Sequence, residues 1–335
     1  MTNAASLWHK REVFAAWLHH LDPFVFQFNG IGPRWYGLSY VLSALAGYWL
    51  YCWLAKRGYT DIAVAKVADF ITWIGLFGVL LGGRIGWIVF YGWGESHDTP
   101  WWWLQVWKGG MASHGGILGI VVVTFILSRR WKVSWTSIGD SLCVVAPVGL
   151  FLVRCANFIN GELYGHETHA AWAVQFPTEM NDSRFAPVAD RAYAALEPQW
   201  ETIAKYGDPK SGWIDQTIEA ARHEPAVRAT LATVLTPRHP SQLYEAFLEG
   251  VVLFTVLWLV RTRCRVPRGM LTGLFFILYA IARITGEVFR VPDPAWSVSG
   301  LSPGQFLSLF MFGIGAAFIV WSQKTRQFER ADSSA

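Results

Sequence analysis

Residues 69–91 read DFITWIGLFGVLLGGRIGWIVFY, and this stretch decides the fold class. Its 23 residues include only two charged ones, Asp69 and Arg84. A helix of about 20 mainly apolar residues is long enough to cross the hydrocarbon core of a bilayer. The sequence therefore predicts that residues 69–91 form a membrane-spanning helix.

The whole chain shares the character of this stretch. Of its 335 residues, 53% are hydrophobic and only 16% are charged, and the mean hydropathy is +0.28. Soluble domains are about a quarter charged, so this composition excludes an ordinary soluble domain, and it also excludes intrinsic disorder. We expect an all-α polytopic membrane protein with about seven transmembrane helices. The other six expected spans are roughly 35–55, 113–128, 138–158, 242–260, 269–290 and 302–322.

The basic residues predict the orientation of the spans. Thirteen Lys and Arg lie in the connections on one side, whereas the opposite connections 92–112 and 291–301 hold only Lys108. Connections rich in Lys and Arg stay in the cytoplasm, so we expect the N-terminus outside and the C-terminus in the cytoplasm. The thirteen residues are Lys56, Arg57, Lys66, Arg129, Arg130, Lys132, Arg261, Arg263, Arg265, Arg268, Lys324, Arg326 and Arg330.

The N-terminal segment has an amphipathic pattern. Trp8, Phe14, Trp17 and Leu18 recur at helical spacing, which favours an amphipathic helix on the outer surface of the membrane over a flexible tail. The expected domains are an N-terminal amphipathic segment 1–33, transmembrane helices 1–4 in 34–158, a head domain 159–238 outside the cytoplasm, transmembrane helices 5–7 in 239–323, and a cytoplasmic tail 324–335.

The expected head domain, residues 159–238, is polar but contains recurring apolar residues. It carries 18 charged residues and a net charge of −4. Residues 172–176 alternate between apolar and polar side chains like a short strand. Residues 188–206 and 213–235 have helical patterns, each interrupted by a Pro. These features predict a small folded domain rather than a linker.

Five ionisable residues lie within or at the ends of the expected spans. With the predicted orientation they all fall at a similar depth, in the outer half of the bilayer: Arg84, His114, Arg154, Arg283 and Glu287. Ionisable residues inside a membrane are costly and are functional candidates by default. Arginine offers a planar fork of donors that matches phosphate oxygens, so the cluster predicts a site for an anionic lipid headgroup.

Simpler interpretations exist for two of these arginines. Arg283 and Glu287 stand four residues apart on one expected helix and could pair with each other. The long side chain of Arg84 could reach the membrane interface on its own.

The four cysteines lie in or beside apolar segments, and the sequence has no zinc-binding motif, so we expect no disulfide framework and no metal.

Six short motifs, in order along the chain, resemble the bacterial prolipoprotein diacylglyceryl transferase family. The longest is RCANFINGELYG at 154–165. The others are WYGL at 35–38, GGRIG at 82–86, SHGG at 113–116, RHPSQLYE at 238–245 and RITGEVFR at 283–290. Two departures are Ala156, where the family often has Gly, and His166, where Arg is frequent. The departures leave the charged candidates intact.

The resemblance implies an activity and a location. Family members transfer the diacylglyceryl group of phosphatidylglycerol to the lipobox cysteine of a prolipoprotein signal peptide, forming a thioether and releasing glycerol 1-phosphate. They have seven spans and a periplasmic head in the bacterial inner membrane. The expected partners are thus phosphatidylglycerol, prolipoproteins and membrane lipids, without nucleic acid. No cofactor is implied, because the phospholipid is itself the activated donor.

The resemblance also implies site residues. Residues that match His114, Arg154, Asn157, Gly165 and Arg283 are important for activity in the family. Those that match four further positions lie in or beside the lipid site, namely Tyr36, Asn160, Glu162 and Glu287. We add Arg84 to the substrate-binding set.

The expected roles follow from this chemistry. His114 is the expected base for the thiol, unless it only forms a hydrogen bond to the lipid glycerol or a helix end. Arg154 and Arg283 are expected at the phosphate, with Glu287 holding Arg283. The asparagines could orient lipid hydroxyls or simply cap a helix. The alternatives to an enzyme are a non-enzymatic binder or transporter of anionic phospholipid, and a structural membrane subunit.

Overall fold

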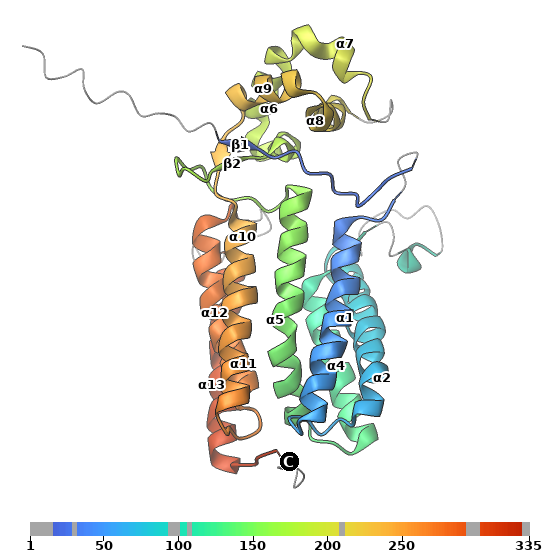
Figure 1. Cartoon of the computed structure of the whole chain (residues 1–335), viewed down its shortest axis with the longest axis vertical. Helices are drawn as coiled ribbons and strands as arrows, with labels where there is room; N and C mark the ends of the chain where they lie inside the picture. Colours follow the sequence, from blue (N-terminus) through green and yellow to red (C-terminus); the bar gives the residue numbers. More distant parts are fainter. Residues whose placement is uncertain are drawn as a thin grey trace, which may run out of the picture. The chain divides into compact units, whose positions relative to one another are not determined.

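The computed structural model describes residues 16–28, 32–92, 101–105, 109–207, 212–292 and 302–329. It is mostly helical (Figure 1). The chain forms two compact units, each assembled from separate stretches. The bundle unit comprises 38–153, 245–284 and 295–335, and the head unit comprises 1–37, 154–244 and 285–294.

Long apolar helices dominate the structure, as the composition predicts. Within the described residues, six are long and apolar enough to cross a membrane. This confirms the all-α polytopic fold class. Four of the six are single helices: α1 (Trp35–Lys56), α5 (Trp135–Asn160), α12 (Met270–Phe289) and α13 (Pro303–Thr325). The fifth is the continuous helix Val64–Gly92, which contains α2 (Val67–Trp73) and α3 (Gly82–Trp87). The sixth is the helix Ser241–Arg263, in which a π-helical segment joins α10 (Ser241–Glu245) to α11 (Leu253–Arg263).

The remaining expected span corresponds to α4 (Ser113–Trp131). Its 19 residues give a length of about 28 Å, close to the thickness of the hydrocarbon core. Polar residues occupy both ends, His114 at the start and Arg129 and Arg130 at the finish. The apolar part is therefore shorter than in the six other helices, which explains why α4 stands apart from them.

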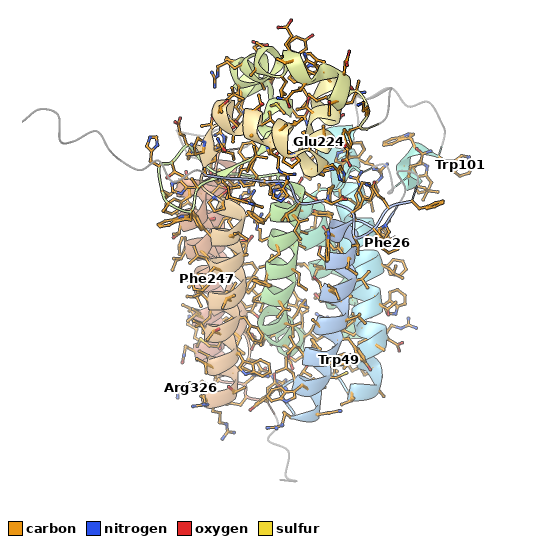
Figure 2. The ribbon with its side chains drawn as sticks, turned by 45° about the horizontal axis from the view of Figure 1, so that its top comes forward. Phe26, Trp49, Trp101, Glu224, Phe247 and Arg326 are labelled. Carbon is orange, nitrogen blue, oxygen red and sulfur yellow. The ribbon has the colours of Figure 1, made fainter. Side chains whose placement is uncertain are left out.

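The bundle unit buries a core of apolar side chains and also exposes many others. Its largest fully buried residues include Tyr51, Phe70 and Leu257. In contrast, the side chain of Trp49 is 73% exposed and that of Phe247 is 57% exposed, and Figure 2 shows both at the outside of the helices. A helix that is apolar on all sides is typical of a membrane span. These exposed side chains are suited to lipid contact.

The head unit contains a small sheet of two-residue strands, β1 (Trp17–Leu18), β2 (Val174–Gln175) and β3 (Pro237–Arg238). The strand order is β1-β2-β3, with β1 parallel and β3 antiparallel to β2. The expectation that Trp17 and Leu18 belong to a helix is therefore wrong, because their backbone pairs with β2. Trp8 and Phe14 lie outside the described residues.

The helices of the head unit confirm the expected Pro-interrupted pattern. The first pattern divides into α6 (Ala186–Ala195), the 3-10 turn Glu197–Gln199 and α7 (Trp200–Ile203). The second divides into α8 (Trp213–His223) and α9 (Pro225–Val234). Pro225 occupies the first position of α9, where the missing N–H costs no helical hydrogen bond. The helices enclose a core that includes Ala192, Leu196, Ile203 and Leu231.

Candidate active site

The end of α5 forms a turn that brings Glu162 back towards the helix. Gly161 has φ +70°, a left-handed conformation that glycine adopts without strain. The Gly161 N–H donates to the Phe158 carbonyl at 2.9 Å, and the Glu162 N–H donates to the Asn157 carbonyl at 3.1 Å. This pair of bonds is the Schellman motif, which satisfies the last carbonyls of a helix. The sequence after α5 therefore folds over its own C-terminal turn.

That turn brings three predicted site residues together. Asn157 Nδ2 donates to Glu162 Oε1 at 2.7 Å, and Asn160 Nδ2 donates to the same oxygen at 3.3 Å. Asn157 is buried, with 4% of its surface exposed. The amide groups of both asparagines thus hold the carboxylate of Glu162. This geometry favours a side-chain cluster over the alternative that the asparagines serve only as helix caps.

Two buried oxygens next to this cluster have no hydrogen-bond donor in the described part of the chain. They are Asn160 Oδ1 and Gln242 Oε1. The Gln242 side chain is fully buried, and its Nε2 donates to the Glu162 carbonyl at 2.5 Å. A buried acceptor without a donor is costly, so the pair is suited to a ligand that supplies hydroxyl groups. Gln242 belongs to the RHPSQLYE motif, but the motif alone does not identify it as a site residue.

Gly165 is held by its neighbours on both sides. Its N–H donates to the His239 carbonyl at 2.8 Å, and it pairs with Arg290 as an isolated bridge. A Cβ atom at this position would lie 2.4 Å from the Phe289 carbonyl oxygen and 2.7 Å from His239 Cβ. A side chain does not fit there, so tight packing of three backbone segments accounts for this glycine.

The other predicted residues of the head unit are partly or fully buried. Arg154 is partly buried and precedes Asn157 by one turn of α5. Tyr36 is partly buried in the first turn of α1. Glu287 is buried in the last turn of α12, with 7% of its surface exposed. Tyr36 and Glu287 thus lie in terminal turns of their helices, and Arg154 lies two turns before the end of α5.

Arg283 contacts two carboxylates in the bundle unit. Its Nη1 donates to Glu245 Oε1 at 2.8 Å and lies 3.7 Å from Glu249 Oε1. Both glutamates are fully buried, and Arg283 retains 15% side-chain exposure. Neither pairing is predicted from the sequence: Glu245 belongs to the RHPSQLYE motif, and Glu249 stands four residues further along, in the π-helical segment Ala246–Val252. π-Helical turns are rare and often mark functional sites.

Arg84 of α3 is buried and donates to four backbone carbonyls. They belong to Trp102, Trp103, Gly109 and Gly110, in the connection before α4. Only 7% of the surface of Arg84 is exposed. The expected role in substrate binding is not what this geometry favours, because most of its donors are already engaged by the protein backbone.

His114 lies in the first turn of α4, and its side chain is exposed. Ala112 occupies the N-cap position of α4, and its side chain forms no capping hydrogen bond. Among the described residues, therefore, no side chain covers the imidazole of His114.

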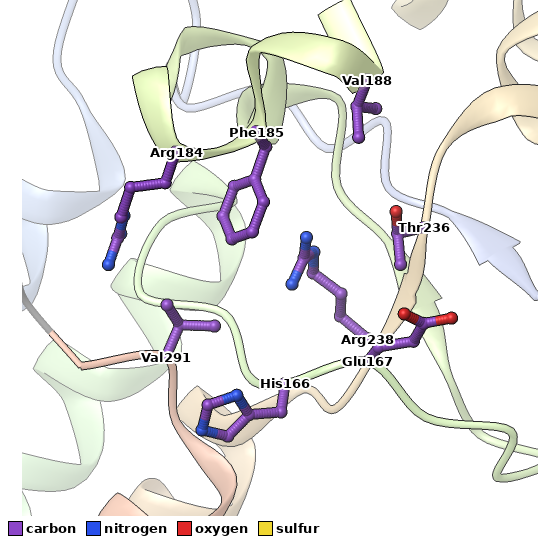
Figure 3. Close-up of a pocket in the computed structure, with 8 residues that line it drawn as sticks. All are labelled: His166, Glu167, Arg184, Phe185, Val188, Thr236, Arg238 and Val291. Carbon is purple, nitrogen blue, oxygen red and sulfur yellow. The ribbon is translucent and has the colours of Figure 1, made fainter.

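A separate pocket of about 440 Å³ lies in the head unit (Figure 3). Figure 3 shows the Arg238 side chain pointing into it, towards Phe185, with His166 on the opposite wall. Arg238 forms an ion pair with the fully buried Glu179 and lies 4.0 Å over the Phe185 ring. The second arginine of this pocket, Arg184, is bound to Asp182. Carboxylates thus neutralise both arginines, which makes the pocket a weak site for an anion.

Comparison with known proteins decides the family. The model of the prolipoprotein diacylglyceryl transferase family matches residues 23–321. The chain belongs to the prolipoprotein diacylglyceryl transferase family. Three relatives named phosphatidylglycerol–prolipoprotein diacylglyceryl transferase are 34–36% identical to it. They come from Bdellovibrio bacteriovorus (36%, covering 91% of this chain and 94% of the relative), Erwinia tasmaniensis (34%, 92% and 94%) and Escherichia fergusonii (35%, 92% and 97%).

The motifs that resemble this transferase family are distributed over both units. The motif at 154–165 and most of 238–245 belong to the head unit, and the motifs at 82–86 and 113–116 belong to the bundle unit. Helix α12 carries Arg283 in the bundle unit and Glu287 in the head unit. The motifs that this chain shares with the transferase family therefore lie on several helices of both units and not on one continuous segment.

Proposed function

We propose that this chain transfers the diacylglyceryl group of phosphatidylglycerol to the thiol of a prolipoprotein lipobox cysteine. The products are a thioether-linked lipoprotein precursor and glycerol 1-phosphate. The observation that carries this proposal is the 34–36% identity to transferases of this name along 91–92% of the chain. Buried polar clusters at the ends of membrane-spanning helices support it, because a lipid headgroup enters at that level.

In the proposed reaction His114 takes the proton of the cysteine thiol. A free thiol has a pKa of about 8.5 and is mostly protonated at neutral pH, so a base raises the thiolate fraction. The thiolate attacks the glyceryl carbon of the diacylglyceryl group, and a carbon–sulfur bond forms. The bond from that carbon to the phosphate oxygen breaks, and its electron pair leaves with glycerol 1-phosphate. The protonated imidazole then returns its proton to solvent or to the product.

Arg154 and Arg283 are assigned to the phosphate group. Negative charge grows on the leaving oxygen as the bond breaks, and prepositioned cations stabilise that charge. The contacts of Arg283 with Glu245 and Glu249 orient its guanidinium, and this adds two carboxylates to the role that we expected of Glu287. The fork of an arginine presents paired donors to phosphate oxygens, which lysine does not.

The cluster at the end of α5 is assigned to the headgroup. Asn160 Oδ1 and Gln242 Oε1 are buried acceptors that would receive the hydroxyl groups of the headgroup glycerol. Asn157 and Glu162 hold Asn160 in place through the shared carboxylate. Tyr36 and Glu287 complete the proposed lipid site, and Gly165 permits the backbone packing that supports it.

The proposed location is the bacterial inner membrane. The basic connections support a periplasmic N-terminus and a cytoplasmic C-terminus. Phosphatidylglycerol and the prolipoprotein signal peptide would then meet the site from within the membrane. The proposed head domain 159–238 would lie in the periplasm.

A transfer assay tests the proposed function. Purified chain is mixed with phosphatidylglycerol vesicles and a synthetic lipobox peptide, and mass spectrometry follows the peptide. We expect a mass gain of one diacylglyceryl group on the cysteine, with no gain on a Cys→Ser peptide. His114→Gln and Arg154→Lys should each lower the rate by about 10²–10³-fold. Arg130→Lys, an exposed change at the far end of α4, is the matched control.

The outcomes separate the candidate functions. No transfer by a folded chain that still binds phosphatidylglycerol would favour the non-enzymatic lipid binder or transporter. Full turnover by His114→Gln would exclude the base role of His114. Normal rates for both Arg154→Lys and Arg283→Lys would exclude the phosphate assignment.

A further inference from the structure

We propose that Arg84 is a positioning residue, which holds the connection between α3 and α4 and thereby sets the place of His114. It acts on the reaction through His114 and not through the lipid phosphate. The kinetic part of this proposal rests on the proposed function. The structural part, that Arg84 orders residues 101–105 and 109–112, stands independently.

The hydrogen bonds of Arg84 join two pieces of the connection. Nε donates to the Trp103 carbonyl at 2.9 Å and Nη2 to the Trp102 carbonyl at 2.6 Å. Nη1 donates to the carbonyls of Gly109 and Gly110, at 2.8 and 3.1 Å. A guanidinium has five N–H donors, so these bonds use four of them. A two-pronged grip on phosphate would require Arg84 to release part of the connection.

Aromatic rings reinforce this arrangement. The guanidinium carbon of Arg84 lies 4.8 Å from the ring centre of Trp87 and 5.9 Å from that of Trp102. A cation over an aromatic face gains about 0.5–2 kcal/mol, more where water is excluded. Trp101 and Trp103 are instead largely exposed, and Trp101 is labelled in Figure 2. The backbone of this connection therefore turns towards Arg84 while two of its indoles face outward.

Gly110, in the connection before α4, packs directly against Arg84. Gly110 has φ +77°, where residues with a side chain are strained. A Cβ on Gly110 would lie 2.5 Å from Arg84 Nη1 and 2.8 Å from the Trp87 ring. Glycine is therefore required at position 110 for two independent reasons, and one of them is the arginine itself.

The held connection leads directly to His114. After Gly110, the N–H of Ala112 donates to the carbonyl of Gly83, the residue before Arg84, at 2.9 Å. Helix α4 begins at the next residue, and His114 is its second residue. Arg84 and its neighbour thus fix the backbone just ahead of His114. A displacement of about 1 Å at a catalytic group can cost about 10²-fold in rate, so this support matters for proton transfer.

The test is Arg84→Lys, with Arg130→Lys as the matched control. Lysine keeps the charge but has no rigid fork with which to reach the four carbonyl groups that Arg84 contacts. We expect kcat to fall about 10–100-fold, whereas KM for phosphatidylglycerol stays within about twofold. Amide hydrogen exchange in residues 101–105 and 109–112 should accelerate, and thermal melting should show that the variant remains folded. Gly110→Ala, which leaves the arginine in place, should reproduce both effects.

Distinct results would overturn the proposal. A large rise in KM, or loss of phosphatidylglycerol binding, with unchanged hydrogen exchange would make Arg84 a phosphate ligand. Unchanged exchange and unchanged kinetics in Arg84→Lys would remove the positioning role altogether. If the wild-type chain shows no transfer, the proposed function fails, and the hydrogen-exchange comparison still decides whether Arg84 holds the connection.

Discussion

The carboxylates that contact Arg283 decide how strongly this arginine requires an external anion. In the sequence, three arginines and one glutamate at similar depth left positive charge that an anionic lipid could neutralise. The structure adds Glu245 and Glu249, both fully buried, next to Arg283. Burying a carboxylate requires a partner, so Arg283 serves these glutamates whether or not lipid is bound. The charge of Arg283 is therefore largely balanced within the protein, so its demand for an external anion is smaller than the sequence suggests.

His19 provides a pH-dependent contact in the head unit. Its Nε2 lies 2.7 Å from the Phe158 carbonyl, and its ring packs against Phe158 and Phe176. Burial lowers the pKa of His19 from 6.5 to about 4, although the Phe158 carbonyl opposes this shift. Between these pH values the unfolded chain binds more protons than the folded chain, so acidification from pH 6.5 to 4 destabilises the fold.

We predict a loss of about 3 kcal/mol from this residue across that pH interval. The measurement is thermal stability in detergent between pH 7 and pH 4, for the wild-type chain and for His19→Gln. Glutamine can donate to the Phe158 carbonyl but does not gain a proton, so the variant should lose less stability in acid. Parallel pH curves for the two proteins would show that His19 does not titrate in this way.

At the scale of elements, glycines allow α3 and the π-helical turns beside it to touch α4 backbone to backbone. A Cβ on Gly115 would lie 2.3 Å from the Gly82 carbonyl oxygen and 2.6 Å from Gly86 Cα. A Cβ on Gly82 would in turn lie 2.6 Å from the Gly115 carbonyl oxygen. Small residues permit this close packing of helices in lipid. Because Gly115 follows His114 directly, the same contact also sets the position of the proposed base.

We predict that Gly115→Ala moves α4 away from α3 and lowers both stability and transfer. The overpacking should cost about 1–3 kcal/mol, and the displaced His114 should lower kcat by about tenfold or more. Gly75→Ala is the matched control, because nothing lies within 4 Å of a Cβ there. Thermal melting and the transfer assay measure the two effects. Equal behaviour of both variants would contradict the close contact.

The elements that the sequence predicted well depend on local patterns. The spans follow from runs of apolar residues about 20 long, and the two helical patterns of the head break where Pro198 and Pro225 stand. The strand at Trp17–Leu18 could not be found this way. It exists because β2, far along the chain, offers a partner backbone, whereas its own spacing of apolar residues suits a helix equally well.

The candidate site was predictable by residue type but not by partner. Charge within a span identified Arg84 and Arg283, and the family motifs identified the cluster at the end of α5. The contacts of Arg84 with loop carbonyls and of Arg283 with Glu249 join residues from different parts of the chain. Such pairings depend on how helices pack, and no local pattern encodes them.

On the scale of the whole molecule, the C-terminal residues tie distant parts of the bundle unit together. Arg268 donates to Glu329 Oε2 at 2.8 Å and to Asp61 Oδ1 at 2.5 Å, and its N–H donates to the Gln327 carbonyl at 2.7 Å. Arg261 lies 3.6 Å from Glu329 Oε1. The segment after α13 thus contacts α11 and the α11–α12 connection, and Arg268 of that connection also contacts Asp61 in the connection after α1. The four charged side chains are mostly buried.

We predict that Glu329→Gln destabilises the chain without impairing chemistry. Removing one member of a buried ion pair costs roughly 3–5 kcal/mol, and we expect about 2 kcal/mol here because Arg268 keeps Asp61. Lys324→Ala, an exposed change in the last turn of α13, should leave the melting temperature unchanged. At temperatures where both variants are folded, their transfer rates should equal that of the wild type, because none of these contacts involves a proposed site residue. A melting temperature unchanged by Glu329→Gln would mean that the C-terminal segment contributes little to the stability of the bundle unit.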